Sequence, residues 1–321
     1  MSDCGLRLRL GVLAALAVGC LSLAWPGAAE AEAAGPYSPT ASPPACTGQF
    51  KQGGLLICRA EPGTVFRFGD DAALEVGEEG AIAYGLARDA DPVLDLAITA
   101  PDGRRTRSDI AIATREDPFR VIRGLDCDKV DARTEAQKAH AARSWQKKQT
   151  AFATFHAPLA DLATFQRPAE GRPSSPFGPE RKYIGVSAET GEPCEKVSVH
   201  RGYDIAAPIG TEIIAPAPGT GILAERDLYY EGGTVFLDRG LGLVSVFLHM
   251  SAVDVAVGDR IDTGERLGAV GNTGRTTGPH LHWAVKWRDT GREARGNDRY
   301  IDPALLLETG SAERADWAAS R

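Results

Sequence analysis

Short runs of apolar and β-branched residues, separated by glycine and proline turns, recur from residue 46 almost to the end of the chain. Residues 55–57 (LLI) and 93–98 (VLDLAI) are two such runs, and the second alternates in the manner of a half-buried strand. Residues 101–103 (PDG) form a strong turn signal after it. Residues 195–308 are again dense in glycine and β-branched residues. The pattern predicts a mainly β protein.

One stretch departs from the β pattern. Residues 131–156 are rich in Ala, Glu, Gln, Lys and Arg and contain no glycine or proline, which predicts one helix of about 20 residues. Residues 167–193 hold nine glycines and prolines and are predicted to be a loop. We therefore expect six parts: a signal peptide (1–33), a linker (34–45), an N-terminal β domain (46–125), a helical connector (126–170), a C-terminal β domain (171–308) and a tail (309–321).

The N-terminus has the three-part pattern of an export signal. Arg7 and Arg9 precede an uncharged run over residues 10–25, which is shorter than the roughly 20 apolar residues of a membrane span. The chain is therefore expected in the periplasm or cell envelope. Residues 17–20 (AVGC) loosely resemble a lipoprotein box, so a lipid anchor on Cys20 is an alternative.

Four cysteines follow the export signal, and an even number in an oxidising compartment favours disulfides. Of the three possible connectivities we favour a local pair, Cys46–Cys58, and a longer one, Cys127–Cys194; buried free thiols are the alternative. No paired C-x-x-C spacing is present, which argues against a cysteine zinc site.

Acidic residues outnumber basic ones by 43 to 36, for a net charge of −7. Nucleic-acid-binding domains usually carry a basic excess, so nucleic acid is not expected as a partner. The 43% hydrophobic and 25% charged residues are ordinary for a globular protein and exclude a disordered chain.

Four of the six histidines fall in the C-terminal β region; the other two, His140 and His156, lie in or beside the predicted helix and are given no role. Residues 200–204 (HRGYD) place a His and an Asp four apart where a strand leaves into a loop. Residues 280–282 (HLH) follow Gly-Pro, and in a strand both imidazoles would face one side with Leu281 on the other.

Two imidazoles and one carboxylate are a known ligand set for a catalytic zinc ion, with the fourth position open for water. The zinc lowers the pKa of that water to about 7, and a further imidazole can accept its proton. Each residue also has a structural interpretation: Asp204 as a turn residue and His249 as a buried histidine bonded to backbone. The combination in one exported β domain favours metal binding.

These residues resemble the lysostaphin-type (LytM-like) zinc endopeptidases of bacterial cell walls. The resemblance runs from about residue 174 to 307 and is carried by four motifs in the family's order and spacing: 175–178 (SPFG), 200–211 (HRGYDIAAPIGT), 247–251 (FLHMS) and 271–283 (GNTGRTTGPHLHW). The β-then-helix region ahead of them is similar only loosely to periplasmic members.

The resemblance implies a two-sheet antiparallel β fold, related to the biotinyl and lipoyl hammerhead, with the site in a groove. It implies one zinc ion per chain, held by His200, Asp204 and His282, and a catalytic pair of His249 and His280. The reaction would be hydrolysis of peptide cross-links in peptidoglycan by zinc-activated water, and the lack of a wall-binding repeat favours a D,D-endopeptidase of the periplasm.

The chain departs from the family in two places. Residues 238–240 read Asp-Arg-Gly where many members have Asp-His-Gly, so the groove edge is expected to differ. Residues 186–196 are an insertion, expected to be a stapled loop rather than a flap over the groove. Arg181 and Tyr183 are expected to be surface residues rather than groove contacts.

The sequence also admits other functions, each with less support from the residues. A LytM-like regulator that activates other wall hydrolases would lack a ligand, and all five site positions are present. Residues 257–268 resemble a carrier-domain repeat, but no lysine lies between Lys196 and Lys286. A cupin site would need a Glu a few residues after His282 and a later His, and neither follows.

The N-terminal β domain could bind a cell-wall regulatory protein, cover the groove or brace the helix.

Overall fold

The computed structural model describes residues 46–127, 131–159, 165–188, 191–291 and 297–307. The predicted signal peptide, the linker, Cys20 and the tail all lie outside these residues. The described chain is mainly β, as the sequence predicts. None of its helices combines the length and the apolar character needed to cross a bilayer.

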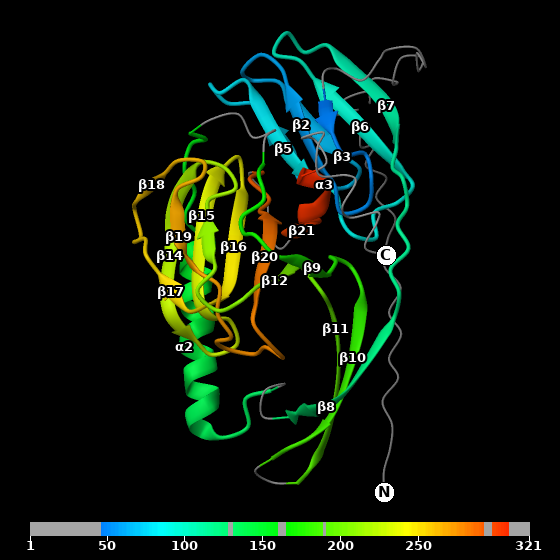
Figure 1. The fold of residues 1–321 in the computed structure, drawn as a ribbon. Coiled ribbons are helices and arrows are strands. Elements are labelled where there is room, and N and C mark those ends of the chain that lie inside the picture. Colours follow the sequence, from blue (N-terminus) through cyan, green and yellow to red (C-terminus); the bar gives the residue numbers. More distant parts are fainter. Residues whose placement is uncertain (1–45, 128–130, 160–164, 189–190, 292–296, 308–321) are drawn as a thin grey trace, which may run out of the picture. The chain divides into compact units, whose positions relative to one another are not determined.

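An eight-stranded antiparallel sheet carries most of the C-terminal region (Figure 1). Its order is β18 (Arg260–Ile261), β14 (Gly219–Leu228), β15 (Gly232–Gly240), β16 (Leu243–Met250), β20 (His280–Trp287), β12 (Tyr203–Ala206) and β9 (Arg172–Ser175), with β21 (Arg299–Ile301) also paired to β20. A second antiparallel sheet contains β13 (Glu212–Ile214), β19 (Arg266–Ala269) and β17 (Ala252–Val253). The expected two-sheet antiparallel fold is confirmed.

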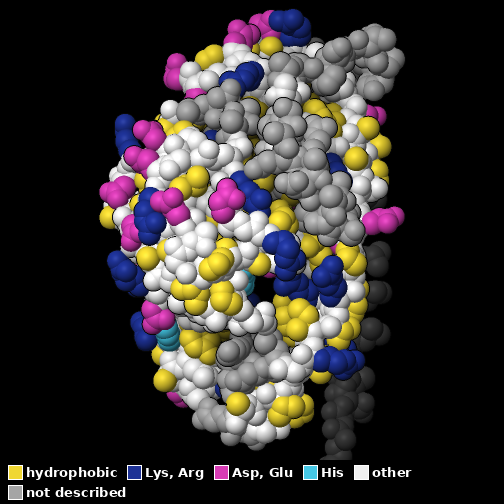
Figure 2. All heavy atoms as spheres, in the orientation of Figure 1, with side chains coloured by type: hydrophobic (Ala, Val, Ile, Leu, Met, Phe, Trp, Pro, Cys, Tyr) yellow, Lys and Arg dark blue, Asp and Glu magenta, His cyan; other side chains and the backbone are white. Residues whose placement is uncertain are grey.

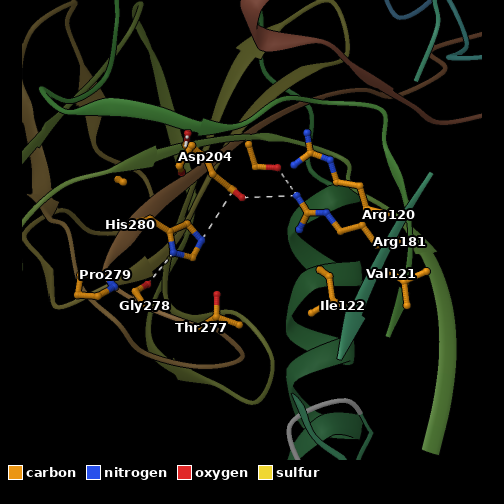
Figure 3. A pocket seen from close by; sticks show the side chains of 12 residues that line it. Arg120, Val121, Ile122, Arg181, Asp204, Thr277, Gly278, Pro279 and His280 are labelled. Atoms are coloured by element: carbon orange, nitrogen blue, oxygen red, sulfur yellow. Dashed lines mark hydrogen bonds and ion pairs between the residues drawn. The ribbon is translucent and has the colours of Figure 1, made fainter. Parts of the chain in front are cut away.

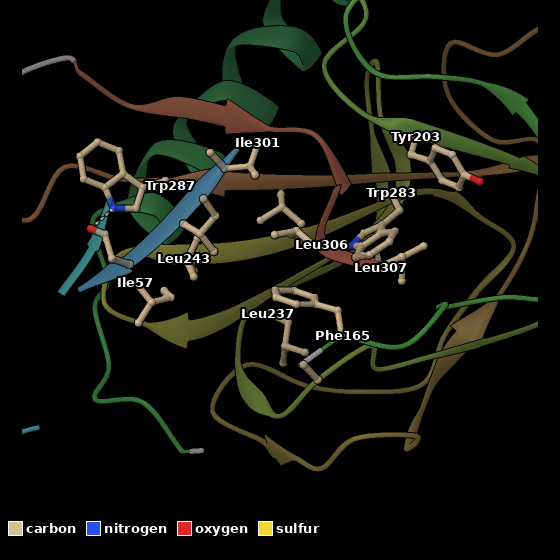
Figure 4. Packing of buried hydrophobic residues seen from close by; sticks show 14 of the residues in the cluster. Ile57, Phe165, Tyr203, Leu237, Leu243, Trp283, Trp287, Ile301, Leu306 and Leu307 are labelled. Atoms are coloured by element: carbon tan, nitrogen blue, oxygen red, sulfur yellow. Dashed lines mark hydrogen bonds between the residues drawn. The ribbon is translucent and has the colours of Figure 1, made fainter. Parts of the chain in front are cut away.

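Strand β20 shows why the alternation of its sequence matters. Leu281, Trp283 and Trp287 are at most 1% exposed and belong to the main apolar core, which Figure 4 shows from close by. Because successive side chains of a strand point to opposite faces, His280 and His282 lie on the other side of the sheet. The sequence predicted this separation of the two imidazoles from Leu281.

Helix α2 (Glu135–Phe152) covers that other face and confirms the helix predicted within residues 131–156, beginning and ending four residues inside that stretch. Thr134 begins it with a capping box, in which the Thr134 hydroxyl accepts from the Gln137 amide and the Gln137 side chain accepts from the Thr134 amide. Its buried Ala151 packs in a second apolar cluster with β-strand residues, among them Phe236 and Ala284.

The N-terminal strands form two antiparallel sheets. One contains β1 (Cys46–Gly48), β2 (Leu55–Arg59) and β5 (Ala81–Gly85), and the other β4 (Leu74–Glu75), β3 (Val65–Phe68), β6 (Val93–Thr99) and β7 (Arg105–Ala111). Their apolar side chains belong to the same core as β20. The indole of Trp287 donates to the Ala83 carbonyl over 2.9 Å, and a Cβ added at Gly85 would lie 2.9 Å from Trp287 Cβ. The residue boundaries expected for the domains stay predictions.

A three-stranded sheet corrects two expectations. It contains β11 (Pro193–Val199), β10 (Glu180–Val186) and β8 (Arg120–Asp126), with β8 parallel to β10. Residues 167–193, expected to be a loop, therefore contain β9 and β10, and residues 193–196 of the insertion belong to strand β11 rather than to a loop. Prolines and glycines suggested a loop, but β10 contains Gly185 and β11 begins at Pro193; each strand runs for seven residues, and the two form an antiparallel hairpin.

Both favoured disulfides are present. Cys46 and Cys58 lie opposite each other on β1 and β2, and Cys127, just after β8, is bonded to Cys194 of β11. The second bond joins the two outer strands of the three-stranded sheet across a sequence separation of 67 residues.

Replacing Cys127 and Cys194 together by serine is expected to lower the free energy of unfolding by about 2–4 kcal/mol, because the long loop is then no longer closed in the unfolded chain. The measurement is the denaturant midpoint of the oxidised wild type against the variant. Loss of Cys46–Cys58, which spans only 12 residues, serves as the comparison and should cost less. An unchanged midpoint for the long-range pair would contradict this expectation.

Candidate metal centre

Strand pairing brings the three predicted metal ligands together. In the antiparallel register of β12 and β20, Asp204 lies directly opposite His282. His200 precedes β12 and is held by its backbone, since its amide donates to the Pro179 carbonyl over 3.0 Å. Asp204 Oδ1 lies 2.8 Å from His282 Nδ1 and 3.1 Å from His200 Nε2.

The two imidazoles also approach each other, with 3.2 Å between His200 Nε2 and His282 Nδ1. Across the described residues, these three side chains form one group whose ligand atoms all lie within 4.8 Å of one another. Ligands of a tetrahedral zinc ion at about 2.0–2.2 Å are themselves about 3.3 Å apart. The donor set and its spacing therefore fit a divalent metal with three protein ligands.

Hydrogen bonds to backbone orient the rings. His200 Nδ1 donates to the Pro176 carbonyl over 2.6 Å, which leaves the lone pair of Nε2 directed at the cluster. This is how histidine ligands are usually held: the second ring nitrogen is bonded to a carbonyl or carboxylate. Gly202 is needed beside them, because a Cβ at that position would lie 2.4 Å from His282 Nε2.

The electrostatics favour the unprotonated ligands that a metal requires. Burial lowers the pKa of His282, although Asp204 opposes the shift. Burial would raise the pKa of Asp204, but His200 and His282 outweigh it and hold that pKa well below its usual range. The centre thus combines a carboxylate that ionises readily, Asp204, with an imidazole whose protonation is disfavoured, His282.

His280 and His249, the predicted catalytic pair, border the cluster. His280 Nε2 lies 3.8 Å from Asp204 Oδ1, and its Nδ1 donates to the Gly278 carbonyl over 2.8 Å. His249 Nδ1 donates to the Thr273 carbonyl over 2.9 Å, and its ring centre lies 4.9 Å from that of His280. In both rings Nδ1 is occupied by a hydrogen bond to backbone, so Nε2 is the nitrogen that can exchange a proton with a substrate or water.

His249 stands out in two further ways. Its φ of 65° is in the left-handed region, which non-glycine residues seldom adopt and which clusters at functional sites. Burial, with smaller contributions from His282 and His280, lowers the pKa of His249 to about 3. The imidazole is therefore neutral in this structure.

A cavity of about 520 Å³ opens beside the centre and is lined by Asp204 and His280 among others. Figure 2 shows the surface hollowed here, with basic side chains gathered along one side. Two of its lining residues are Arg181 of β10 and Arg120 of β8 (Figure 3). The expectation that Arg181 is an ordinary surface residue is wrong, because its side chain is only 14% exposed and Nη2 lies 3.8 Å from Asp204 Oδ2.

The remaining predicted positions lie elsewhere. Tyr183 does not line the cavity. Arg239 is not at a groove edge either: it is 1% exposed, with its guanidinium 4.1 Å from the centre of the Phe165 ring. His140 and His156, which were given no role, bond to the Asp227 carbonyl and to Asp238, away from the centre.

Comparisons with known proteins agree with this geometry. Residues 198–303 match the profile of Peptidase family M23. The chain is 37% identical over 154 residues to an uncharacterized metalloprotease of Haemophilus influenzae (47% of this chain, 28% of that protein). It is also 37% identical over 91 residues to the peptidoglycan DD-endopeptidase ShyA of Vibrio cholerae (28% of this chain, 21% of that protein). The chain thus spans about a quarter of the length of these relatives.

A solved structure described as a peptidase M23 from Pseudomonas aeruginosa is similar over a longer stretch. It covers 81% of this chain and 96% of its own, at 28% identity and a TM-score of 0.57. The likeness therefore extends ahead of the matched domain into the N-terminal strands and α2. Together with the sequence match and the donor cluster, it leads to one conclusion: the chain carries a peptidase family M23 domain over residues 198–303.

Proposed function

We propose that the chain is an exported zinc metalloendopeptidase that hydrolyses peptide cross-links of peptidoglycan, at bonds between D-configured residues. The observation that carries the proposal is the cluster of His200, Asp204 and His282 beside two further imidazoles in an M23 domain. The match to a protein named as a peptidoglycan DD-endopeptidase supports the substrate class. The export signal predicted for residues 1–33 supports a location in the periplasm or cell envelope.

His200, Asp204 and His282 would hold one zinc ion. When bound, zinc supplies a Lewis acid and lowers the pKa of a coordinated water to about 7. Asp204 contributes the single negative charge, and the Pro176 carbonyl fixes the His200 ring. The open cavity next to them leaves space for an extended peptide.

His280 and His249 would handle protons. In each ring Nδ1–H is bonded to a backbone carbonyl, so Nε2 carries the lone pair that can accept a proton. His280, 3.8 Å from Asp204, is placed to take a proton from the attacking water and to pass it to the leaving amine. His249, whose ring centre lies 4.9 Å from that of His280, is placed as a second proton acceptor, since its Nε2 carries a lone pair while Nδ1–H is bonded to the Thr273 carbonyl.

The test is digestion of purified sacculi by the full chain, followed by mass spectrometry of the muropeptides. We expect cross-linked dimers to be converted to monomers, a loss of that conversion after dialysis against a chelator, and its recovery when zinc is added back. The expected loss is at least tenfold in rate, because removing zinc removes both the Lewis acid and the coordinated water of lowered pKa.

Two outcomes would overturn the proposal. Cleavage that persists in the chelated protein would exclude the metal. Stoichiometric metal with no release of monomers would favour the alternative, a regulator that activates other wall hydrolases. Recovery by zinc but not by magnesium distinguishes a nitrogen-ligated metal from an oxygen-ligated one.

A further inference from the structure

Two guanidinium groups lie together on one side of the metal centre. Arg181 and Arg120 are partners in the parallel register of β10 and β8, so their side chains leave the same face of the three-stranded sheet. Figure 3 shows both groups near Asp204, on the side away from the His280 backbone. Arg181 Nη2 lies 3.8 Å from Asp204 Oδ2 and also donates to the Ser175 hydroxyl.

The charges of this cluster are not balanced within the protein. The Arg120 side chain is exposed, and its guanidinium has no hydrogen-bond or ion-pair partner among the residues that the structure describes. The charged side chains lining the cavity are these two arginines and one carboxylate, Asp204, whose Oδ1 already faces His200 and His282. At 3.8 Å, the contact of Arg181 with Oδ2 is at the long limit for an ion pair. The cavity therefore offers an excess of positive charge to a ligand.

We propose that Arg181 and Arg120 bind a free carboxylate of the substrate, located on the carbon next to the scissile nitrogen. The inference rests on the proposed function and names the substrate's chemistry at that site. Guanidinium groups bind carboxylates through two parallel hydrogen bonds, which adds geometric selectivity to charge attraction. The substrate class is a peptide bond whose amine-side residue keeps this neighbouring carboxyl group unamidated.

The reach of the two arginines fits this placement. The carboxylate carbon is three bonds from the scissile carbonyl carbon, a span of less than about 4 Å with standard bond lengths. Arg181 Nη2 is separated from the ligand Asp204 by a similar distance, 3.8 Å. A carbonyl at the metal centre would therefore bring its neighbouring carboxylate within contact of Arg181, with Arg120 beside it.

Both arginines lie outside the stretch matched by the family profile, residues 198–303. They come from strands that form a separate sheet, joined by the Cys127–Cys194 disulfide. The selectivity for a free carboxylate is thus a property of the strands that precede the matched domain.

The test uses two synthetic cross-linked dimers that differ in one group. Each joins D-alanine to the amine on the D-configured carbon of a diamino acid; the neighbouring carboxyl is free in one and a primary amide in the other. The wild-type full chain with zinc is expected to cleave the free acid with a kcat/KM about tenfold or more higher, mainly through a lower KM.

The variants are chosen to distinguish a role of Arg120 and Arg181 in binding the substrate carboxylate (the carboxylate anchor) from a role in stabilising the fold. Arg120→Gln should raise KM for the free acid about tenfold and leave KM for the amide as it is in the wild type. The preference, defined as the ratio of kcat/KM for the free acid to kcat/KM for the amide, should therefore fall towards one. Arg181→Lys should reduce the preference in part, since it keeps the charge but not the forked geometry. Arg123→Gln is the matched control: it is on the same strand, exposed, and does not line the cavity. Metal content should equal that of the wild type in all three.

Equal kcat/KM of the wild type for both dimers would overturn the anchor and leave the proposed function standing. A fall in kcat for both dimers in Arg120→Gln would also overturn it, because that is the signature of a structural role. If the wild type cleaves neither dimer, the proposed function fails instead. In that case NMR titration of the two dimers decides on the anchor: tighter binding of the free acid, lost in Arg120→Gln, supports it, and equal affinities overturn it.

Discussion

Replacing His280 by alanine is expected to leave one metal ion bound per chain and to lower the rate of cross-link cleavage about 10²–10⁴-fold, the usual contribution of a general acid–base group. The reason is geometric. His280 Nε2 lies 3.8 Å from Asp204 Oδ1, outside the ring of three short contacts that hold His200, Asp204 and His282 together. Its loss removes a proton carrier and leaves the donor set intact.

His200→Ala should behave in the opposite way. It removes one of three nitrogen and oxygen donors, so metal affinity should fall more than the about 10–100-fold seen when a supporting residue is lost. Activity then disappears together with the metal. Adding excess zinc should restore part of the activity of His200→Ala and none of the activity of His280→Ala.

Metal content after gel filtration, measured by atomic emission, and muropeptide release are the two readouts. His140→Ala is the control, since His140 lies on α2 and bonds to the Asp227 carbonyl away from the cavity. Equal metal content in His200→Ala and His280→Ala would contradict the division of roles between ligands and proton carriers.

The largest loss of stability is expected from Asp238→Asn, about 3–5 kcal/mol in the free energy of unfolding. The side chains of Asp238 and Arg288 are 0% and 1% exposed, and Arg288 Nη2 lies 2.9 Å from Asp238 Oδ1. Burial lowers the pKa of Arg288, and Asp238 opposes that shift. Removing the carboxylate would leave a buried guanidinium without its counter-charge.

Asp238 also joins separate parts of the chain. Oδ2 accepts from the His156 amide over 2.9 Å, so the carboxylate holds the segment after α2 against β15. The measurement is the denaturant midpoint at constant m-value. The double variant Asp238→Leu with Arg288→Met is the control and should recover much of the loss, because a hydrophobic replacement of a buried pair is often tolerated. A loss below about 1 kcal/mol for Asp238→Asn would contradict the expectation.

The positions of the site's imidazoles could be predicted from the sequence because they follow from the local geometry of strands and turns. The period of two in a strand sets His280 and His282 on one face, and Leu281 in the core confirms the register. Gly202 and the nearby Pro208 argued against a helix and favoured an arrangement in which His200 and Asp204 converge at a strand end. The structure adds the short contacts between them.

The pairing of Arg120 with Arg181 could not be predicted from the sequence, because it depends on a non-local contact. Arg120 and Arg181 meet only through the parallel pairing of β8 with β10, a contact between segments far apart in the chain. Neither β10 (ERKYIGV) nor β11 (PCEKVSV) alternates charged with apolar residues, and the prolines and glycines of this region predicted a loop. Likewise, the Asp-Arg-Gly tripeptide at 238–240 drew attention to a groove edge, whereas Asp238 and Arg239 are buried.

The shared apolar core limits how the chain could be shortened. A fragment cut to residues 198–303 would retain Trp287 and Ile301 but not the strand that carries Ala83 and Gly85. The indole N–H would lose its carbonyl acceptor, and a surface that is now internal would meet water. Such a minimal fragment would be prone to self-association, so work on catalysis is best carried out with the strands from residue 46 onward retained.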